Sequence, residues 1–122
     1  MIQLDHLAVD ARDVAASARF LADILGLADP VPEGEDDDMY RVDLDHGVFV
    51  LLSPASEPRF SHVAFRVDAA RFATIVGRLR ARGVAFGNDH DDTHNHRTDD
   101  LLGGAGRLYF HDANGHLWEV TC

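Results

Sequence analysis

The sequence predicts an α+β fold built from two paired β-α-β-β-β modules whose sheets form an open cleft. Each half of the 122-residue chain opens with an alternating, strand-like segment and continues with apolar residues at helical spacing. The histidines of the two opening segments, His6 and His62, are 56 positions apart. The glycines that end the helical stretches, Gly26 and Gly83, are 57 positions apart. This near-constant offset indicates an internal duplication.

Each module has too little apolar surface to close a core alone, so we expect one domain spanning residues 1–122. The first module covers about residues 1–56 and the second about residues 57–122. Pairing of the two sheets buries both sets of apolar faces, and the space between the sheets is the expected site.

The first module begins with a strand over residues 2–9, where apolar side chains alternate. Asp10 is predicted to cap the helix that follows, and Gly26 to end it. The apolar residues at helical spacing are Val14, Ala18, Leu21 and Leu25.

Three further strands complete the first module in this interpretation. A short one lies near residues 28–31, and two longer ones at 39–44 and 48–52 are joined by the turn 45–47. The acidic run 33–38 is interpreted as a solvated loop.

The second module repeats the order. A strand over 60–67 precedes a helix capped by Asp68 and ended by Gly83, and strands follow at 84–86, 107–111 and 117–121. The helix carries its apolar stripe on Phe72, Ile75, Val76 and Leu79.

The last two strands form a hairpin whose register follows from burial. Placing the apolar residues of both strands on one face requires Phe110 to lie opposite Trp118, which fits a three-residue loop with Gly115 in the left-handed conformation. Glu119 then lies opposite Tyr109. A carboxylate between two apolar neighbours needs a cation, a hydrogen-bond donor or water, unless it simply faces solvent on an edge strand.

The charge and composition of the chain disfavour two classes of binding partner. Eleven Lys and Arg against 21 Asp and Glu give a net charge of −10, which disfavours nucleic acid and anionic membrane surfaces. No apolar stretch is long enough to span a membrane, and the single cysteine, Cys122, cannot form an intramolecular disulfide. With no basic segment preceding an apolar run at the start of the sequence, we expect a cytoplasmic protein.

Two imidazoles at matching positions of the repeat and one carboxylate form the donor set of open catalytic metal sites, either zinc or non-haem iron. We therefore take His6, His62 and Glu119 as candidate ligands of one divalent ion (Fe, Mn, Ni, Co or Zn). The alternative for each histidine is a residue satisfied by a neighbour in the core or on the sheet surface.

These residues, together with the segments 4–9, 61–65 and 109–119, resemble the vicinal oxygen chelate superfamily over nearly the whole chain. That superfamily includes glyoxalase I, extradiol dioxygenases, fosfomycin-inactivating enzymes and metal-free bleomycin-binding proteins. The resemblance implies that His6, His62 and Glu119 hold the metal, commonly in a homodimer, and that the substrate binds through adjacent oxygens. The fourth ligand position of glyoxalase I falls in residues 48–52, where no side chain can bind a metal.

The resemblance also implies that Tyr109 contacts the substrate. A metal-dependent glyoxalase-like or dioxygenase-like enzyme acting on a small oxygenated metabolite or antibiotic is the favoured hypothesis. The alternatives are a metal-free binding protein of the bleomycin-resistance type and a fosfomycin-type thiol transferase.

The long polar loop 88–106 is the remaining unusual segment. As a lid over the metal it places His90, His94 or His96 as a proton donor or acceptor. Of these we take His96 as the catalytic candidate and His94 as the substrate-binding candidate. The segment is otherwise a solvated loop, or one whose histidines bind metal on their own. Arg107 shares a face with Tyr109 and is a candidate to bind an anionic substrate group, unless a nearby acid pairs with it.

Overall fold

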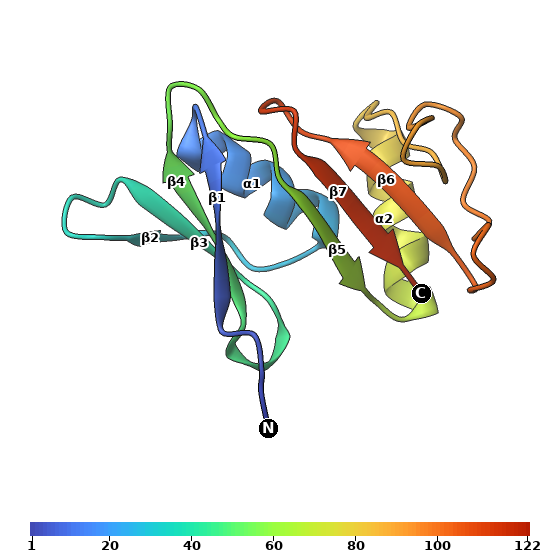
Figure 1. Cartoon of the computed structure of the whole chain (residues 1–122), viewed down its shortest axis with the longest axis horizontal. Helices are drawn as coiled ribbons and strands as arrows, with labels where there is room; N and C mark the ends of the chain where they lie inside the picture. Colours follow the sequence, from blue (N-terminus) through green and yellow to red (C-terminus); the bar gives the residue numbers. More distant parts are fainter. The chain divides into compact units, whose positions relative to one another are not determined.

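The computed structural model describes all of residues 1–122, which divide into two compact units, Met1–Phe60 and Ser61–Cys122 (Figure 1). Each unit has one sheet with parallel and antiparallel strand pairs and one α-helix. The predicted α+β class is therefore confirmed. Neither helix is long and apolar enough to cross a membrane.

The first unit contains four strands and helix α1 (Val14–Leu25). Its sheet has the order β1-β4-β3-β2, with β1 and β4 parallel and the other neighbours antiparallel. Helix α1 contacts β1, β3 and β4 through a buried apolar side. The strands are β1 (His6–Ala11), β2 (Val31–Glu33), β3 (Met39–Asp43) and β4 (Phe49–Pro54), and the 3-10 turn Asp45–Gly47 joins the last two.

Helix α1 begins three residues later than the sequence analysis predicted. Its cap is Asp13, whose side chain accepts a hydrogen bond from the backbone N–H of Ala16 at 3.1 Å. Asp10 was the wrong choice because β1 continues through Ala11 in register with β4, and Asp10 instead binds Arg59. Gly26 ends the helix with φ 70°, as predicted.

Two strand boundaries in this unit also differ from the predictions. The first strand begins at His6 rather than residue 2, because its partner β4 begins at Phe49, which lies opposite His6. The short strand is displaced to Val31–Glu33, where it pairs with β3. Glu33 therefore belongs to a strand and binds Arg41 at 2.6 Å, while residues 34–38 form the exposed turn.

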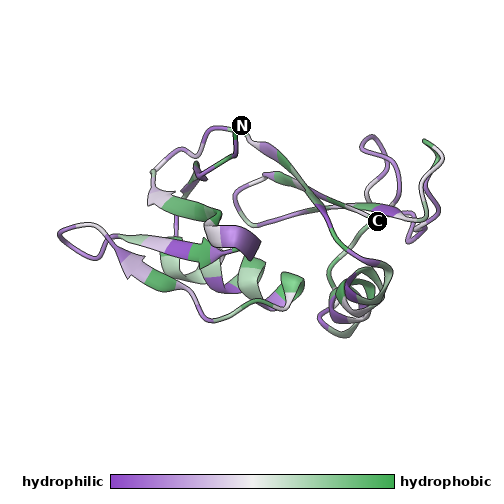
Figure 2. Cartoon of the chain, turned by 90° about the horizontal axis from the view of Figure 1, so that it is seen from below, coloured by the Kyte–Doolittle hydropathy of each residue, from purple (hydrophilic) through white to green (hydrophobic).

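The second unit contains β5 (His62–Arg66), α2 (Ala69–Ala81), β6 (Arg107–His111) and β7 (Leu117–Thr121). Its sheet has the order β5-β7-β6, with β5 and β7 parallel and β6 and β7 antiparallel. Asp68 caps α2 as predicted, accepting from the N–H of Arg71 at 2.7 Å. Figures 1 and 2 show α2 along one face of this sheet.

The predicted strand 84–86 is absent, so the second sheet has three strands rather than four. Only Gly87 pairs with β6, through reciprocal backbone hydrogen bonds to Tyr109. Beyond it the side chain of Asn95 accepts hydrogen bonds from the N–H groups of Asn88 and Arg97. These local turn bonds compete with strand pairing and fold the chain away from the sheet edge.

The terminal hairpin has the predicted register. Phe110 lies opposite Trp118 and Tyr109 opposite Glu119, and Gly115 has φ 84° in the loop. Phe110 and Trp118 are almost completely buried, and strand alternation places Glu119 on the opposite face of the sheet from Trp118. That opposite face carries the polar side chains of the candidate site.

Candidate metal centre

One face of the three-stranded sheet of the second unit carries several polar side chains. Strand alternation places them there, because residues two apart in a strand share a face. They include His62 on β5, Glu119 on β7, and Arg107 and Tyr109 on β6.

His62 and Glu119 lie side by side on this face. The register pairs Glu119 with Ala64, two residues after His62, so the histidine is its diagonal neighbour on the adjacent strand. Nε2 of His62 is 2.9 Å from Oε1 of Glu119. The histidine side chain is 44% exposed and the glutamate side chain 8%. An imidazole nitrogen and a carboxylate oxygen thus meet at a point that is open on the histidine side.

The second oxygen of Glu119 is engaged by Arg107, whose Nη1 donates a hydrogen bond to Oε2. The other edge of the same guanidinium binds Asp100, with Nε 2.8 Å from Oδ1. Burial of Glu119 is thereby compensated by a hydrogen-bonded cation, which a buried carboxylate requires. The hydrogen bond to Asp100 also holds the pKa of Arg107 well above its ordinary value.

Tyr109 stands directly opposite Glu119 on β6 and is 7% exposed. Burial, and then the negative charge of Glu119, raise the pKa of the Tyr109 phenol. The phenol therefore keeps its proton at neutral pH. Two imidazole rings flank it, with centroids 6.3 Å away for His62 and 6.2 Å for His90.

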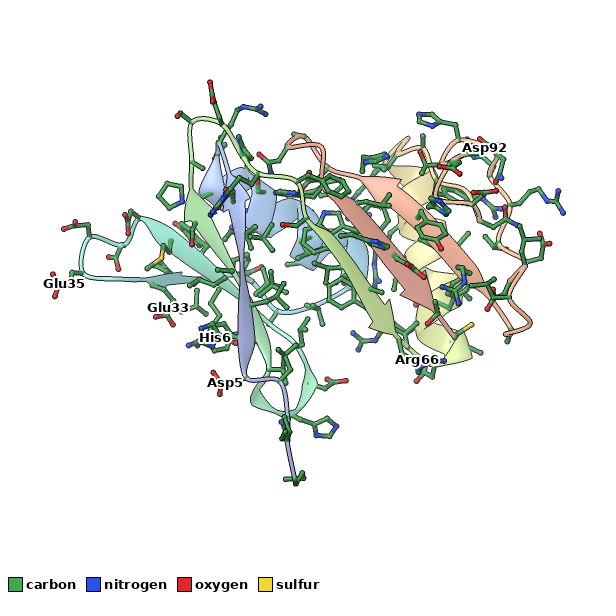
Figure 3. The ribbon with its side chains drawn as sticks, in the orientation of Figure 1. Asp5, His6, Glu33, Glu35, Arg66 and Asp92 are labelled. Carbon is green, nitrogen blue, oxygen red and sulfur yellow. The ribbon has the colours of Figure 1, made fainter.

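The third candidate ligand, His6, is the first residue of β1 in the first unit. Its ring stacks on Phe49 at 4.7 Å, and its Nδ1 lies 2.6 Å from Oδ2 of Asp5 (Figure 3). In the tautomer that carries its proton on Nδ1, the ring donates to this carboxylate and Nε2 has a free lone pair.

The two units differ at the position of the carboxylate. In unit two Glu119 pairs with Ala64, two residues after His62. In unit one Leu51 pairs with Ala8, two residues after His6. The chain therefore offers one carboxylate and two histidines at the repeated positions, and a leucine where a second carboxylate would stand.

The histidines of loop 88–106 lie in different surroundings. The ring of His96 packs on buried Phe86 at 4.9 Å, and Nδ1 of His94 is 3.1 Å from the hydroxyl of Thr93. His90 is the one that neighbours Tyr109. The contacts of His94 and His96 give no support to the roles expected for them, which stay predictions.

One residue of this site, Asp100, was missed from the sequence. Asp99 and Asp100 are adjacent in the sequence, yet Asp100 binds Arg107 whereas Asp99 binds Arg97. The signal for Asp100 was indirect, since a half-buried arginine needs a counter-ion. His90 was one of the three loop histidines offered as a proton donor or acceptor, and its ring lies 6.2 Å from that of Tyr109.

A second group of metal-binding atoms lies in the loop, where Asp89, His90 and Asp91 offer ligand atoms within 4.8 Å of one another. Nδ1 of His90 is 3.8 Å from Asp89 and Nε2 is 3.3 Å from Asp91. Since His90 and Asp91 are exposed, a metal ion from solvent can reach these atoms, and the cluster is an alternative candidate metal site on the loop.

Comparison with known proteins places the chain in a family. The model of the Glyoxalase/Bleomycin resistance protein/Dioxygenase superfamily matches residues 3–120. The chain belongs to this superfamily. No curated protein matches it.

Several solved structures of the superfamily resemble this chain. Oxidase ChaP-H1 is 37% identical, with 98% of this chain and 94% of that chain covered and a TM-score of 0.87. Oxidase ChaP-H2 is 36% identical, with 98% and 91% covered and a TM-score of 0.84. A glyoxalase/dioxygenase from Nostoc punctiforme, 20% identical with 98% and 90% covered and a TM-score of 0.75, shares the fold.

Proposed function

We propose that this superfamily member is a metal-dependent enzyme that binds a divalent ion through His6, His62 and Glu119. Its substrate is a small molecule that presents two adjacent oxygens to the metal. The observation that carries the proposal is the 2.9 Å approach of His62 Nε2 to Glu119 Oε1 on one sheet face.

The donor atoms suit such an ion. Metal bonds to imidazole nitrogen and carboxylate oxygen are about 2 Å long, so two donors of one ion lie roughly 3 Å apart. His6, with its Nδ1 held by Asp5, supplies the third donor in this proposal. Three protein ligands leave coordination positions free for the two substrate oxygens.

Oxidation is the reaction class that the comparisons favour. The relatives at 37% and 36% identity are named oxidases, and the family description includes dioxygenases. Two histidines and one carboxylate are also the ligand set of non-haem ferrous oxygenases. We therefore propose iron as the working metal, which when bound supplies Lewis-acid and redox chemistry.

The chain's own residues bind and orient the substrate. Tyr109 keeps its phenolic proton beside Glu119 and donates a hydrogen bond to a substrate oxygen that gains negative charge. His90, whose ring lies 6.2 Å from that of Tyr109, brings the loop to the same side of the sheet. A role of the loop as a lid remains part of the proposal.

The experiment compares metal content and metal affinity across variants. Freshly purified protein is analysed for bound metals, and the metal-free protein is titrated with Fe²⁺ under anaerobic conditions and with Co²⁺ and Zn²⁺. The variants are His6→Ala, His62→Ala and Glu119→Gln. The controls are His46→Asn, an exposed histidine at φ 61° where asparagine is tolerated, and Glu57→Gln, an exposed glutamate.

One metal per chain, lost in the three variants and kept in the two controls, supports the proposal. Folded protein that binds none of these ions favours the metal-free binding protein. If the protein binds one ion per chain and is active with any of several redox-inert ions, an isomerase or thiol transferase is favoured over an oxidase.

A further inference from the structure

The hydrogen bonds that Arg107 donates to carboxylates are divided between Asp100 and Glu119. Its Nε and Nη2 atoms form one edge of the guanidinium and face Asp100, at 2.8 Å from Oδ1 and 3.5 Å from Oδ2. Only Nη1 reaches Glu119, and it donates to Oε2 alone. The other oxygen of Glu119, Oε1, faces His62. Arg107 therefore grips Asp100 with two atoms and Glu119 with one.

The turn that follows Asp100 holds its carboxylate in place. The carboxylate accepts hydrogen bonds from the backbone N–H groups of Leu102 at 2.9 Å and Gly104 at 3.0 Å, and the side chain is 3% exposed. A Cβ at Gly104 would lie 2.3 Å from Oδ2, so glycine permits this close approach. Asp100 is thus fixed by its own turn and not by Arg107 alone.

We propose that Asp100 is a positioning residue for the metal ligand Glu119. Because Asp100 occupies the Nε/Nη2 edge of Arg107, the arginine is limited to one oxygen of Glu119, and Oε1 stays available to the metal. This inference rests on the proposed function, since it assigns a role within the same site.

The chemistry of arginine gives the reason. A guanidinium edge and a carboxylate form paired, parallel hydrogen bonds, and this two-point contact is the preferred one. With Asp100 removed, the free edge of Arg107 can turn to Glu119 and engage both oxygens. The Arg107 guanidinium would then compete with the metal ion for Glu119. With Asp100 present, Arg107 instead fixes the orientation of Glu119, as outer partners of ligating carboxylates do.

The test is a double-mutant cycle read by metal affinity. Metal-free protein is titrated with Co²⁺ by calorimetry for the unsubstituted chain, Asp100→Asn, Arg107→Met and the double variant. Asparagine keeps an oxygen for the N–H of Leu102 and loses the acceptor for the N–H of Gly104, and the comparison with the Arg107→Met background separates this effect on the turn from an effect through Arg107. Asp99→Asn removes the same charge from the neighbouring exposed residue and is the matched control. Circular dichroism and thermal unfolding check that each variant is folded.

We expect Asp100→Asn to weaken Co²⁺ binding by about 10- to 100-fold in the presence of Arg107, the range typical of outer-sphere changes. In the Arg107→Met background the same substitution is expected to change affinity by less than about twofold, and Asp99→Asn to have no effect. If Arg107→Met does not fold, Arg107→Lys serves instead, because lysine has no two-atom edge.

Two results overturn the inference. Equal losses in both backgrounds would show that Asp100 acts through the loop alone, and an undiminished affinity in Asp100→Asn would show that it does not position the ligand. A folded, unsubstituted chain that binds no Co²⁺ overturns the proposed function instead, and the inference with it. The unsubstituted titration thus separates the two failures.

Discussion

Leu51 occupies in the first unit the strand position that Glu119 occupies in the second. Each pairs with the alanine two residues after the module's opening histidine, Ala8 in one case and Ala64 in the other. The duplication thus kept both histidines and only one carboxylate. In the proposed metal site this gives three protein donors, and a three-donor site leaves more coordination positions for a substrate than a site of four.

Restoring the symmetry should strengthen metal binding. Leu51→Glu places a carboxylate at the repeated position, opposite Arg41 on β3, which already pairs with Glu33 and Asp43. We expect Co²⁺ affinity to rise by about tenfold or more, equal to about 1.4 kcal/mol, because a fourth donor, the second that carries a negative charge, is added. Leu51→Gln, which has similar size without the charge, is the control. An affinity no higher than that of the control would contradict the assignment of this position.

Asp100 should make the protein sensitive to acid. The Arg107 hydrogen bond, with that from the Leu102 backbone, holds the pKa of Asp100 below its usual range. Its contribution to stability is therefore full above the unfolded-state pKa of about 4 and is lost as the pH falls through the lower, folded-state value. Urea unfolding between neutral pH and about pH 3 should show a smaller acid loss in Asp100→Asn than in the unsubstituted chain. An identical loss in both proteins would contradict this.

Tyr109→Phe should separate binding from turnover. The substitution removes a hydroxyl that is not among the proposed ligands, so Co²⁺ affinity is expected to stay within about twofold. Turnover of a substrate drawn from a panel of compounds with adjacent oxygens should fall by about 10²- to 10⁴-fold, with kcat affected more than KM. If metal affinity fell and turnover did not, Tyr109 would be structural.

Gly77→Ala should stabilise the protein without touching the site. Gly77 lies in the interior of α2, is exposed, and has no atom within 4 Å of an added Cβ. Alanine favours the helix by about 0.8–1 kcal/mol over glycine, and urea unfolding should show a gain of that order. Unchanged Co²⁺ affinity would accompany it. A loss of stability would show that helix α2 is packed differently from the structure described.

The parts of the fold that local patterns determine were predictable from the sequence. Alternation and the need to bury Phe110 with Trp118 predicted the hairpin register and, with it, the opposition of Tyr109 and Glu119. Asp68 and Gly26 follow local capping chemistry, so they were also correct. The strand 84–86 was wrong because turn bonds of Asn95, which periodicity does not reveal, take the chain away from the sheet.

The candidate site was predictable only where strands carry it. His62 was chosen from the repeat and Glu119 from the hairpin register, and the structure places the two side chains 2.9 Å apart. The parallel pairing of β5 with β7 that makes them neighbours was not predicted. Asp100 could not be distinguished from Asp99, since which of the two faces Arg107 depends on the path of an irregular loop. The position of His90 beside Tyr109 depends on the same loop path.

The most direct test of the central claim is anomalous diffraction from crystals of the Co²⁺-loaded protein. We predict one strong cobalt peak per chain, at about 2 Å from Nε2 of His6, Nε2 of His62 and Oε1 of Glu119. A peak at Asp89, His90 and Asp91 with none at Glu119 would contradict it and place the metal on the loop.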